Sequence, residues 1–159
     1  NLKEDIECID ILVDTEWGPT KIATGEAEIV GPRSYSKLSA RYVVLAVPPL
    51  SPSNDDEEFD ADSVDQDTLH YLETTLRSAY RSSVQMVKNT GMEGFGIVPV
   101  TTKAGGKVYE RTLRIGLQTL IDEAKTTRLH SIHLMAATEK EAKILIKLAI
   151  AFGLEEAEA

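Results

Sequence analysis

Apolar segments of two kinds alternate along the chain, and they predict different elements. Continuous apolar runs rich in β-branched residues are typical of strands, whereas apolar residues repeated every three or four positions are typical of helices. The first pattern predicts four strands, at Cys8–Val13, Tyr42–Val47, Phe95–Val100 and Ser131–Met135. The second and third of these runs carry no charged residue, which is typical of strands buried on both faces. Residues 14–25 should form a loop with a turn at Gly18-Pro19.

Amphipathic segments predict three helices. The first covers residues 68–88, and its inner face is formed by Leu69, Leu72, Leu76, Ala79, Ser83 and Val87. The second is marked by Leu113, Leu117, Leu120, Ile121 and Ala124. The third begins at Thr138, which is placed to form a capping box with Glu141. Its predicted inner face consists of Ala142, Leu145, Ala149 and Phe152.

From residue 42 onward, a strand is followed by a helix three times. Such a run of βαβ units gives a mostly parallel sheet with helices on both faces, because the crossovers are right-handed. We therefore predict a three-layer α/β/α domain with a mostly parallel, mixed central sheet. The length of 159 residues suits a single domain spanning 1–159.

The net charge of −9 is concentrated in two places. Residues 54–67 hold eight carboxylates and no basic residue, and the end of the chain adds Glu155, Glu156 and Glu158. Without these groups the chain is close to neutral. We interpret 51–67 as an acidic loop insertion and 154–159 as an acidic tail, and the loop is a candidate contact for a protein partner. A basic patch with interleaved aromatic residues is not visible, so general nucleic-acid binding is not expected.

Other classes of protein are excluded by what the sequence lacks. No apolar run approaches the ~20 residues of a membrane span, and no signal peptide is recognisable, so no membrane partner is expected. One cysteine, Cys8, excludes an intramolecular disulfide and a multi-cysteine zinc site, and it fits an intracellular protein of the cytoplasm or nucleus. His130 and His133 lie three apart around a predicted strand, so their side chains point to opposite faces. We therefore expect neither a metal nor a cofactor.

In open α/β sheets, ligands bind beyond the carboxyl ends of the strands. The segments predicted there are Asp14–Gly18, the loop after Val47, Thr101–Tyr109 and Ala136–Thr138. The third contains Gly105-Gly106 between Lys103 and Lys107, directly before a predicted helix. Glycines allow backbone N–H groups to approach an anion, and the helix start and the lysines favour negative charge. This loop is therefore either a diphosphate cradle or a simple turn.

Four segments together resemble the macro domain, an α/β module that binds ADP-ribose. Residues 4–14 resemble the family's opening GDIT…DAIVN, and 24–29 with 38–44 resemble TGEAxIT…LPARYVIHxVGP. Residues 98–102, with the glycines behind them, are similar to the family's phosphate loop. Residues 131–143 are similar to its last strand and the start of its final helix. The resemblance covers nearly the whole chain, with the acidic loop as an insertion.

The resemblance implies roles for particular residues. Asp5 would accept a hydrogen bond from the adenine amino group, and Ile6 would offer its backbone N–H to the ring. The diphosphate would be held by backbone N–H groups and a hydroxyl of the residues Thr102, Gly105 and Gly106. Tyr109 would stand near the aromatic residue that closes over the distal ribose.

The chain also departs from the family pattern. Nine residues separate Asp14 from Thr24, where the family has a ligand loop with NAAN and a Gly-rich stretch. Asp14 stands at the first Asn of that motif, and Lys103 with Ala104 interrupts the phosphate loop. In addition, Leu45 replaces the usual His and Pro48 replaces a Gly. The end of the last predicted strand, Met135-Ala136-Ala137, contains no aromatic residue.

Three functions remain open on these grounds. The first is a non-catalytic reader of ADP-ribose, of a related ADP-ribosyl nucleotide or of an ADP-ribosylated protein. The second is a degenerate scaffold for protein–protein contacts. The third is an ADP-ribosyl hydrolase with Asp14, Glu16 or Lys103 as base or nucleophile. A Gly-rich loop between Asp14 and Trp17 in the full-length chain would favour the reader and the hydrolase, whereas a genuine nine-residue junction would favour the scaffold.

Overall fold

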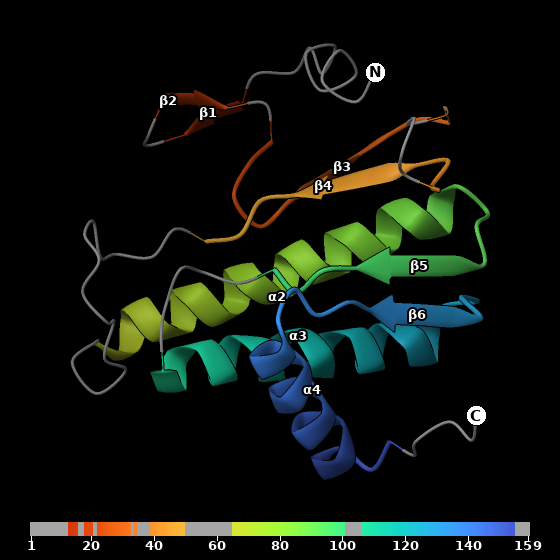
Figure 1. The fold of residues 1–159 in the computed structure, drawn as a ribbon. Helices are drawn as coiled ribbons and strands as arrows, with labels where there is room; N and C mark the ends of the chain where they lie inside the picture. The colour runs from red at the N-terminus through yellow and green to blue at the C-terminus, as the bar shows by residue number, and fades with distance from the viewer. Residues whose placement is uncertain are drawn as a thin grey trace.

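A computed structural model describes residues 13–15, 18–20, 22–32, 34, 39–49, 65–100 and 106–154, with side chains from residue 22 onward except at 106–108. The elements follow the order β1, β2, β3, β4, α2, β5, α3, β6 and α4. Figure 1 shows β4, β5 and β6 pointing to one side of the molecule, where α2, α3 and α4 begin. The predicted strand Cys8–Val13 lies outside the described residues except for Val13, and most of the acidic loop and tail also lie outside them.

Two pairs of strands are antiparallel. β1 (Val13–Thr15) pairs with β2 (Gly18–Thr20), and β3 (Ala27–Val30) pairs with β4 (Val43–Ala46). The prediction of a turn at Gly18-Pro19 is wrong, since both residues lie in β2. Proline is tolerated at an edge position where its missing N–H is not needed by a neighbour. All four residues of β4 are half-buried, so this strand is less enclosed than its apolar sequence predicts.

The third pair is parallel. β5 (Gly94–Ile97) lies beside β6 (Ser131–Leu134), with Ile97 opposite Leu134. In β5, Phe95 and Ile97 are buried while the two glycines are exposed, so only one face of this strand is covered. The described strands thus mix parallel and antiparallel pairing, in three two-stranded sheets.

The three predicted helices are present. α2 spans Gln66–Asn89, α3 spans Gly106–Thr126 and α4 spans Glu139–Ala151. Asp65, from the predicted acidic loop, is the N-cap of α2 and accepts a hydrogen bond from the Thr68 N–H at 2.8 Å. Part of the acidic run therefore starts a helix, because a carboxylate satisfies free N–H groups at a helix N-terminus.

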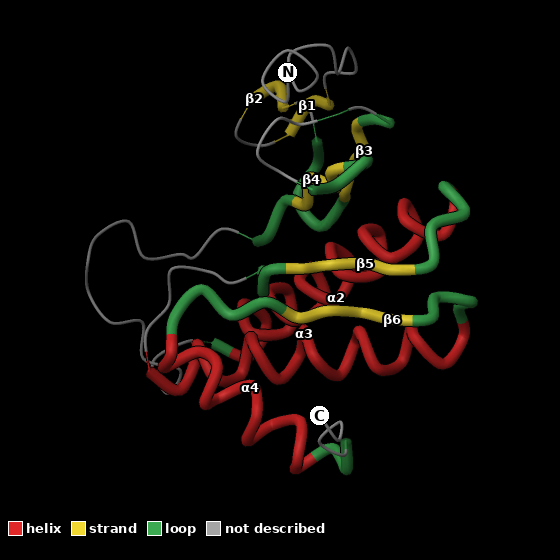
Figure 2. The backbone as a smooth tube through the Cα atoms, turned by 45° about the vertical axis from the view of Figure 1, so that its right-hand side comes forward, coloured by secondary structure: helices red, strands yellow, loops and turns green. Residues whose placement is uncertain are grey.

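Helix α2 is buried on more of its surface than predicted. Its buried residues are Leu69, Leu76, Ala79, Tyr80, Ser83, Val84 and Val87, whereas Leu72 is half-buried. The helix contacts β3 and β4 on one side and α3 on another. Figure 2 shows β5 and β6 running alongside α2 and α3.

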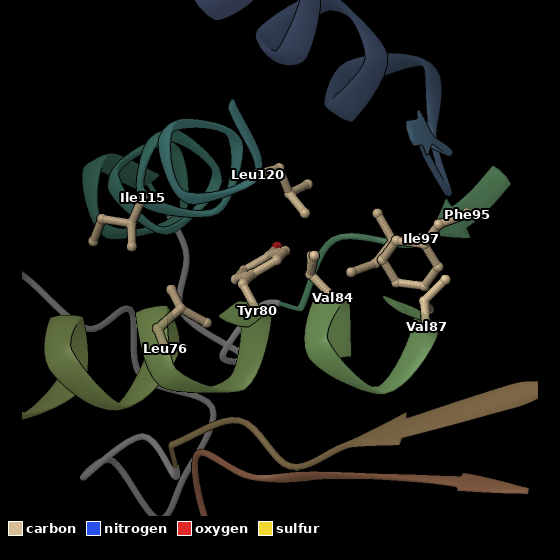
Figure 3. Packing of buried hydrophobic residues seen from close by; sticks show 8 residues of the cluster. All are labelled: Leu76, Tyr80, Val84, Val87, Phe95, Ile97, Ile115 and Leu120. Carbon is tan, nitrogen blue, oxygen red and sulfur yellow. The ribbon is translucent and has the colours of Figure 1, made fainter. Parts of the chain in front are cut away.

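Two groups of buried side chains form the core. The larger joins α2, β5 and α3, and Figure 3 shows its members: Leu76, Tyr80, Val84, Val87, Phe95, Ile97, Ile115 and Leu120. The smaller joins α3 and α4 through Leu113, Leu117, Leu145 and Leu148. Leu134 of β6 packs against both groups. The parallel strand pair is therefore held by side chains from all three helices.

Candidate functional site at the carboxyl ends of β5 and β6

The carboxyl ends of β5 and β6 lie side by side. The Met135 N–H donates to the Ile97 carbonyl at 2.8 Å, which extends the pairing one residue beyond β6. Val98 is 53% exposed and Met135 is 50% exposed, so apolar side chains face solvent where the strands end. The next helices, α3 and α4, begin on this side of the molecule (Figure 1). This edge combines apolar surface with helix N-termini, an arrangement suited to a ligand that has a ring and an anionic group.

A buried carboxylate lies at the start of α4. Glu141 is only 5% exposed, and its Oε2 accepts a hydrogen bond from the Ala137 N–H at 3.2 Å. Its own N–H donates to Oγ1 of Thr138, the N-cap, at 3.2 Å. The predicted capping box is confirmed on the threonine side. The Glu141 carboxylate, however, accepts its hydrogen bond from Ala137, the residue before the N-cap. The helix dipole favours negative charge in this region.

Glu141 lies near two tyrosines. Tyr109, in the first turn of α3, is half-buried against the α3–α4 group of core residues. Burial raises the pKa of Tyr109, and so do the charge of Glu141 and a hydrogen bond to its carboxylate. The pKa of Tyr80 rises to about 12, mainly because of burial and also because of the charge of Glu141, although a backbone N–H lowers it. Both phenols are therefore neutral at physiological pH.

Tyr80 also links the end of β5 to α3. Its hydroxyl accepts a hydrogen bond from the Val100 N–H at 2.8 Å. A Cβ at position 116 of α3 would clash with the same hydroxyl oxygen, so the close approach of the two helices requires Gly116 there. Tyr80 thus contacts both Val100, which comes just before residues 101–105, and α3, which comes just after them.

A hollow lies between α2 and α3. It is lined by Pro49, Leu69, Leu72, Glu73, Leu76, Arg111, Thr112 and Ile115. The Arg111 Nε donates to Glu73 Oε1 at 2.6 Å, so the two charged members of the lining are paired. Since Pro49 follows β4, this hollow lies beyond the carboxyl end of that strand.

The predicted site residues are placed as follows. Asp5, Ile6, Thr102, Lys103 and Gly105 lie outside the described residues. Asp14 lies in β1 opposite Pro19, Gly106 is the first residue of α3, and Tyr109 is in its first turn. Gly106 and Tyr109 are thus close together along one helix.

Tyr80 and Glu141 are not among the predicted site residues. The sequence does indicate that both side chains face inward, because each is spaced from an apolar residue so that it falls on the inner face of its helix. Tyr80 lies four residues after Leu76, and Glu141 lies four before Leu145. A polar group on an apolar face is informative because burying it without a partner is costly.

Neither a metal cluster nor a membrane span is found in the part of the chain that the structure describes. No group of three or more His, Cys, Asp or Glu residues there could hold a metal ion. None of the described helices combines the length and the apolar character needed to cross a membrane.

Comparison with solved structures shows the fold. The macrodomain of Oceanobacillus iheyensis with ADP is 18% identical, with 82% of this chain and 60% of that one covered and a TM-score of 0.64. A glycine-to-valine mutant of that macrodomain with ADPR is also 18% identical, over 86% and 63% of the two chains, with a TM-score of 0.64. The macro domain of ganglioside induced differentiation associated protein 2 is 21% identical, over 93% and 61%, with a TM-score of 0.64.

The chain therefore has the α/β fold of macrodomains. The predicted fold class and the resemblance noted in the sequence are confirmed at the level of the fold. The chain spans about three fifths of the length of these structures. No protein-family model and no curated protein matches it.

Proposed function

We propose that the protein binds ADP-ribose or a related ADP-ribosyl nucleotide and acts as a non-catalytic reader, with ADP-ribosylated protein as its partner. The observation that carries the proposal is the macrodomain fold, shared with structures that contain ADP or ADPR. The juxtaposed carboxyl ends of β5 and β6, which point to the side of the molecule where α3 begins, supply a suitable place for such a ligand.

The roles in this proposal follow the resemblance. Asp5 and Ile6 bind the adenine through a carboxylate and a backbone N–H. Thr102, Gly105 and Gly106 hold the diphosphate together with the N-terminus of α3. Affinity in this scheme comes mainly from N–H groups and the helix dipole, so the net charge of −9 is compatible with an anionic ligand.

At the other end of the ligand, Tyr109 lies beside the distal ribose and Lys103 adds positive charge near the phosphates. Asp14 takes the position of the first ligand-loop asparagine. No cofactor or metal is needed for this kind of binding. Expected locations are the cytoplasm or the nucleus.

Isothermal titration with ADP-ribose tests the proposal. The wild-type protein should bind at micromolar concentration, and Asp5→Ala should weaken binding more than about tenfold, or roughly 1.4 kcal/mol. Asp122→Ala, which removes an exposed carboxylate from α3, is the matched control and should bind like wild type. Absence of heat and of a thermal shift at millimolar ligand would overturn the proposal.

The reader role requires a separate assay. Incubation of the protein with an ADP-ribosylated substrate should leave the modification in place over many hours. Release of free ADP-ribose at a rate proportional to protein concentration would instead establish a hydrolase.

A second candidate is a scaffold for protein–protein contacts. The β1–β2 hairpin favours it, because Gly18 pairs with Thr15 in the stretch where the resemblance expects a long ligand loop. A scaffold would bind a protein partner, with the acidic residues 51–67 as the expected contact, and would not respond to ADP-ribose. Titration with ADP-ribose therefore separates the two candidates.

A further inference from the structure

Tyr80 differs from Ser83 and Thr119, two other buried hydroxyl residues of the described helices, in the backbone that its hydroxyl bonds. Ser83 Oγ donates to the Ala79 carbonyl at 2.8 Å, and Thr119 Oγ1 donates to the Ile115 carbonyl at 2.7 Å, so each bonds the backbone of its own helix, although Thr119 Oγ1 also accepts from the Arg77 side chain of α2 at 3.4 Å. Tyr80 is 1% exposed, yet its hydroxyl bonds the Val100 N–H, 20 residues away and beyond the end of β5. A phenylalanine would fill the same space without the cost of burying a hydroxyl.

The bond to Val100 fixes where the chain leaves β5. Val100 is followed directly by residues 101–105, for which we propose contacts to the diphosphate, and then by α3. Val100 is half-buried, and an N–H that loses its acceptor in such a place is costly, so the Val100 backbone is held at the phenol. In Figure 3 the ring of Tyr80 rises from α2 toward α3, with the hydroxyl at its far end.

Gly116 gives the phenol a second contact, on the helix that follows residues 101–105. The Cβ that any other residue would carry at this position would clash with the hydroxyl oxygen and Cζ of Tyr80. Helix α3 is therefore seated directly against the ring. One side chain therefore contacts the backbone at Val100, just before the segment, and α3 at Gly116, ten residues after that helix begins at Gly106.

We propose that Tyr80 is a positioning residue for ligand binding, which holds the backbone at Val100, beyond the end of β5, against helix α3. This inference rests on the proposed function, since it assigns Tyr80 a part in ADP-ribose binding. Tyr80 acts through Val100 and α3 and does not itself touch the ligand.

The decisive variant is Tyr80→Phe, which keeps the ring and removes the acceptor. Its matched control is Ser83→Ala, which removes a buried hydroxyl from the same helix but leaves Val100 unaffected. Both are titrated with ADP-ribose below their unfolding temperatures. We expect Tyr80→Phe to raise Kd by about fivefold or more, and Ser83→Ala to stay within about twofold of wild type.

Hydrogen exchange gives a readout that a general loss of stability would not produce. The Val100 amide should exchange faster in Tyr80→Phe relative to other β5 amides, and at an unchanged relative rate in Ser83→Ala. Gly116→Ala tests the second contact, because it keeps the hydroxyl but displaces it. This variant should also weaken ADP-ribose binding, and it decides the matter if Tyr80→Phe does not fold.

The outcomes separate this inference from the function on which it rests. Wild-type protein that does not bind ADP-ribose overturns the proposed function and the inference with it. Wild-type binding with an equal Kd in Tyr80→Phe overturns the inference alone. Equal weakening by Tyr80→Phe and Ser83→Ala also overturns it, because the effect would then come from lost core stability.

Discussion

The buried phenol of Tyr80 makes the stability of the fold depend on pH in the alkaline range. Burial is the main reason that its pKa rises from 10.0 to about 12. Between these two values the unfolded chain gives up the phenolic proton while the folded chain keeps it. Because the unfolded state then binds fewer protons, the free energy of unfolding falls as the pH rises. This contribution is fully present below pH 10 and is lost as the pH passes through 12.

The magnitude follows from the difference between the two pKa values. Two units correspond to about 2.7 kcal/mol in total, and about 1.4 kcal/mol of this is lost at pH ~11. At pH ~9, wild type should be more stable than Tyr80→Phe by about 1–3 kcal/mol, because the variant leaves the Val100 N–H without its acceptor. That advantage should shrink by about 1.4 kcal/mol at pH ~11.

Urea unfolding followed by circular dichroism measures both values. Other groups titrate in the same range, so the quantity of interest is the difference between wild type and Tyr80→Phe at each pH. Tyr71→Phe, which removes an exposed phenol from the same helix, is the control. If the difference between wild type and Tyr80→Phe is the same at both pH values, the phenol is not buried as described and the reasoning fails.

Three further predictions concern α4 and its surroundings. Leu148→Ala should lower the free energy of unfolding by about 2–5 kcal/mol, because Leu148 is 1% exposed. In the same urea assay, the control Ile150→Ala should change it by less than about 0.5 kcal/mol, because Ile150 is 69% exposed. Thr138→Ala removes the N-cap and should cost about 1 kcal/mol, and recovery of that stability by Thr138→Ser would identify the hydroxyl as the cause. Glu141→Gln should lower the pKa of Tyr109, since it removes a nearby negative charge. Phenolate absorbance during alkaline titration measures this pKa, and an unchanged titration curve would argue against the contact.

The helices could be predicted from the sequence because their signal extends over many turns. In α2 the spacing of apolar residues identifies a continuous face, and the observed helix extends the predicted range by two residues at the start and one at the end. Strands carry a weaker signal. In β5, Gly96 interrupts the apolar run, and the strand is covered on one face rather than two. Gly18-Pro19 shows the limit of local rules, since pairing with β1 overrides a turn preference.

The site could be predicted only in part, because its contacts join distant positions. Local spacing identifies Tyr80 and Glu141 as inward-facing, but it does not indicate their partners. Val100 lies 20 residues from Tyr80, and Tyr109 and Glu141 come from different helices. The roles of the other predicted site residues come from the family resemblance and stay predictions.

The two-sided burial of α2 has a consequence for how the chain unfolds. On one side, a Cβ at Gly25, in the turn before β3, would lie 3.1 Å from Thr75 Cγ2, and Ser82 Oγ bonds the Gly25 carbonyl at 3.4 Å. On another side, Leu76 and Tyr80 pack against β5 and α3. Neither the β3–β4 pair nor the β5–β6 pair keeps its packing if α2 melts. The described elements should therefore unfold in one cooperative transition, with α2 as the last segment to open rather than a part that frays first.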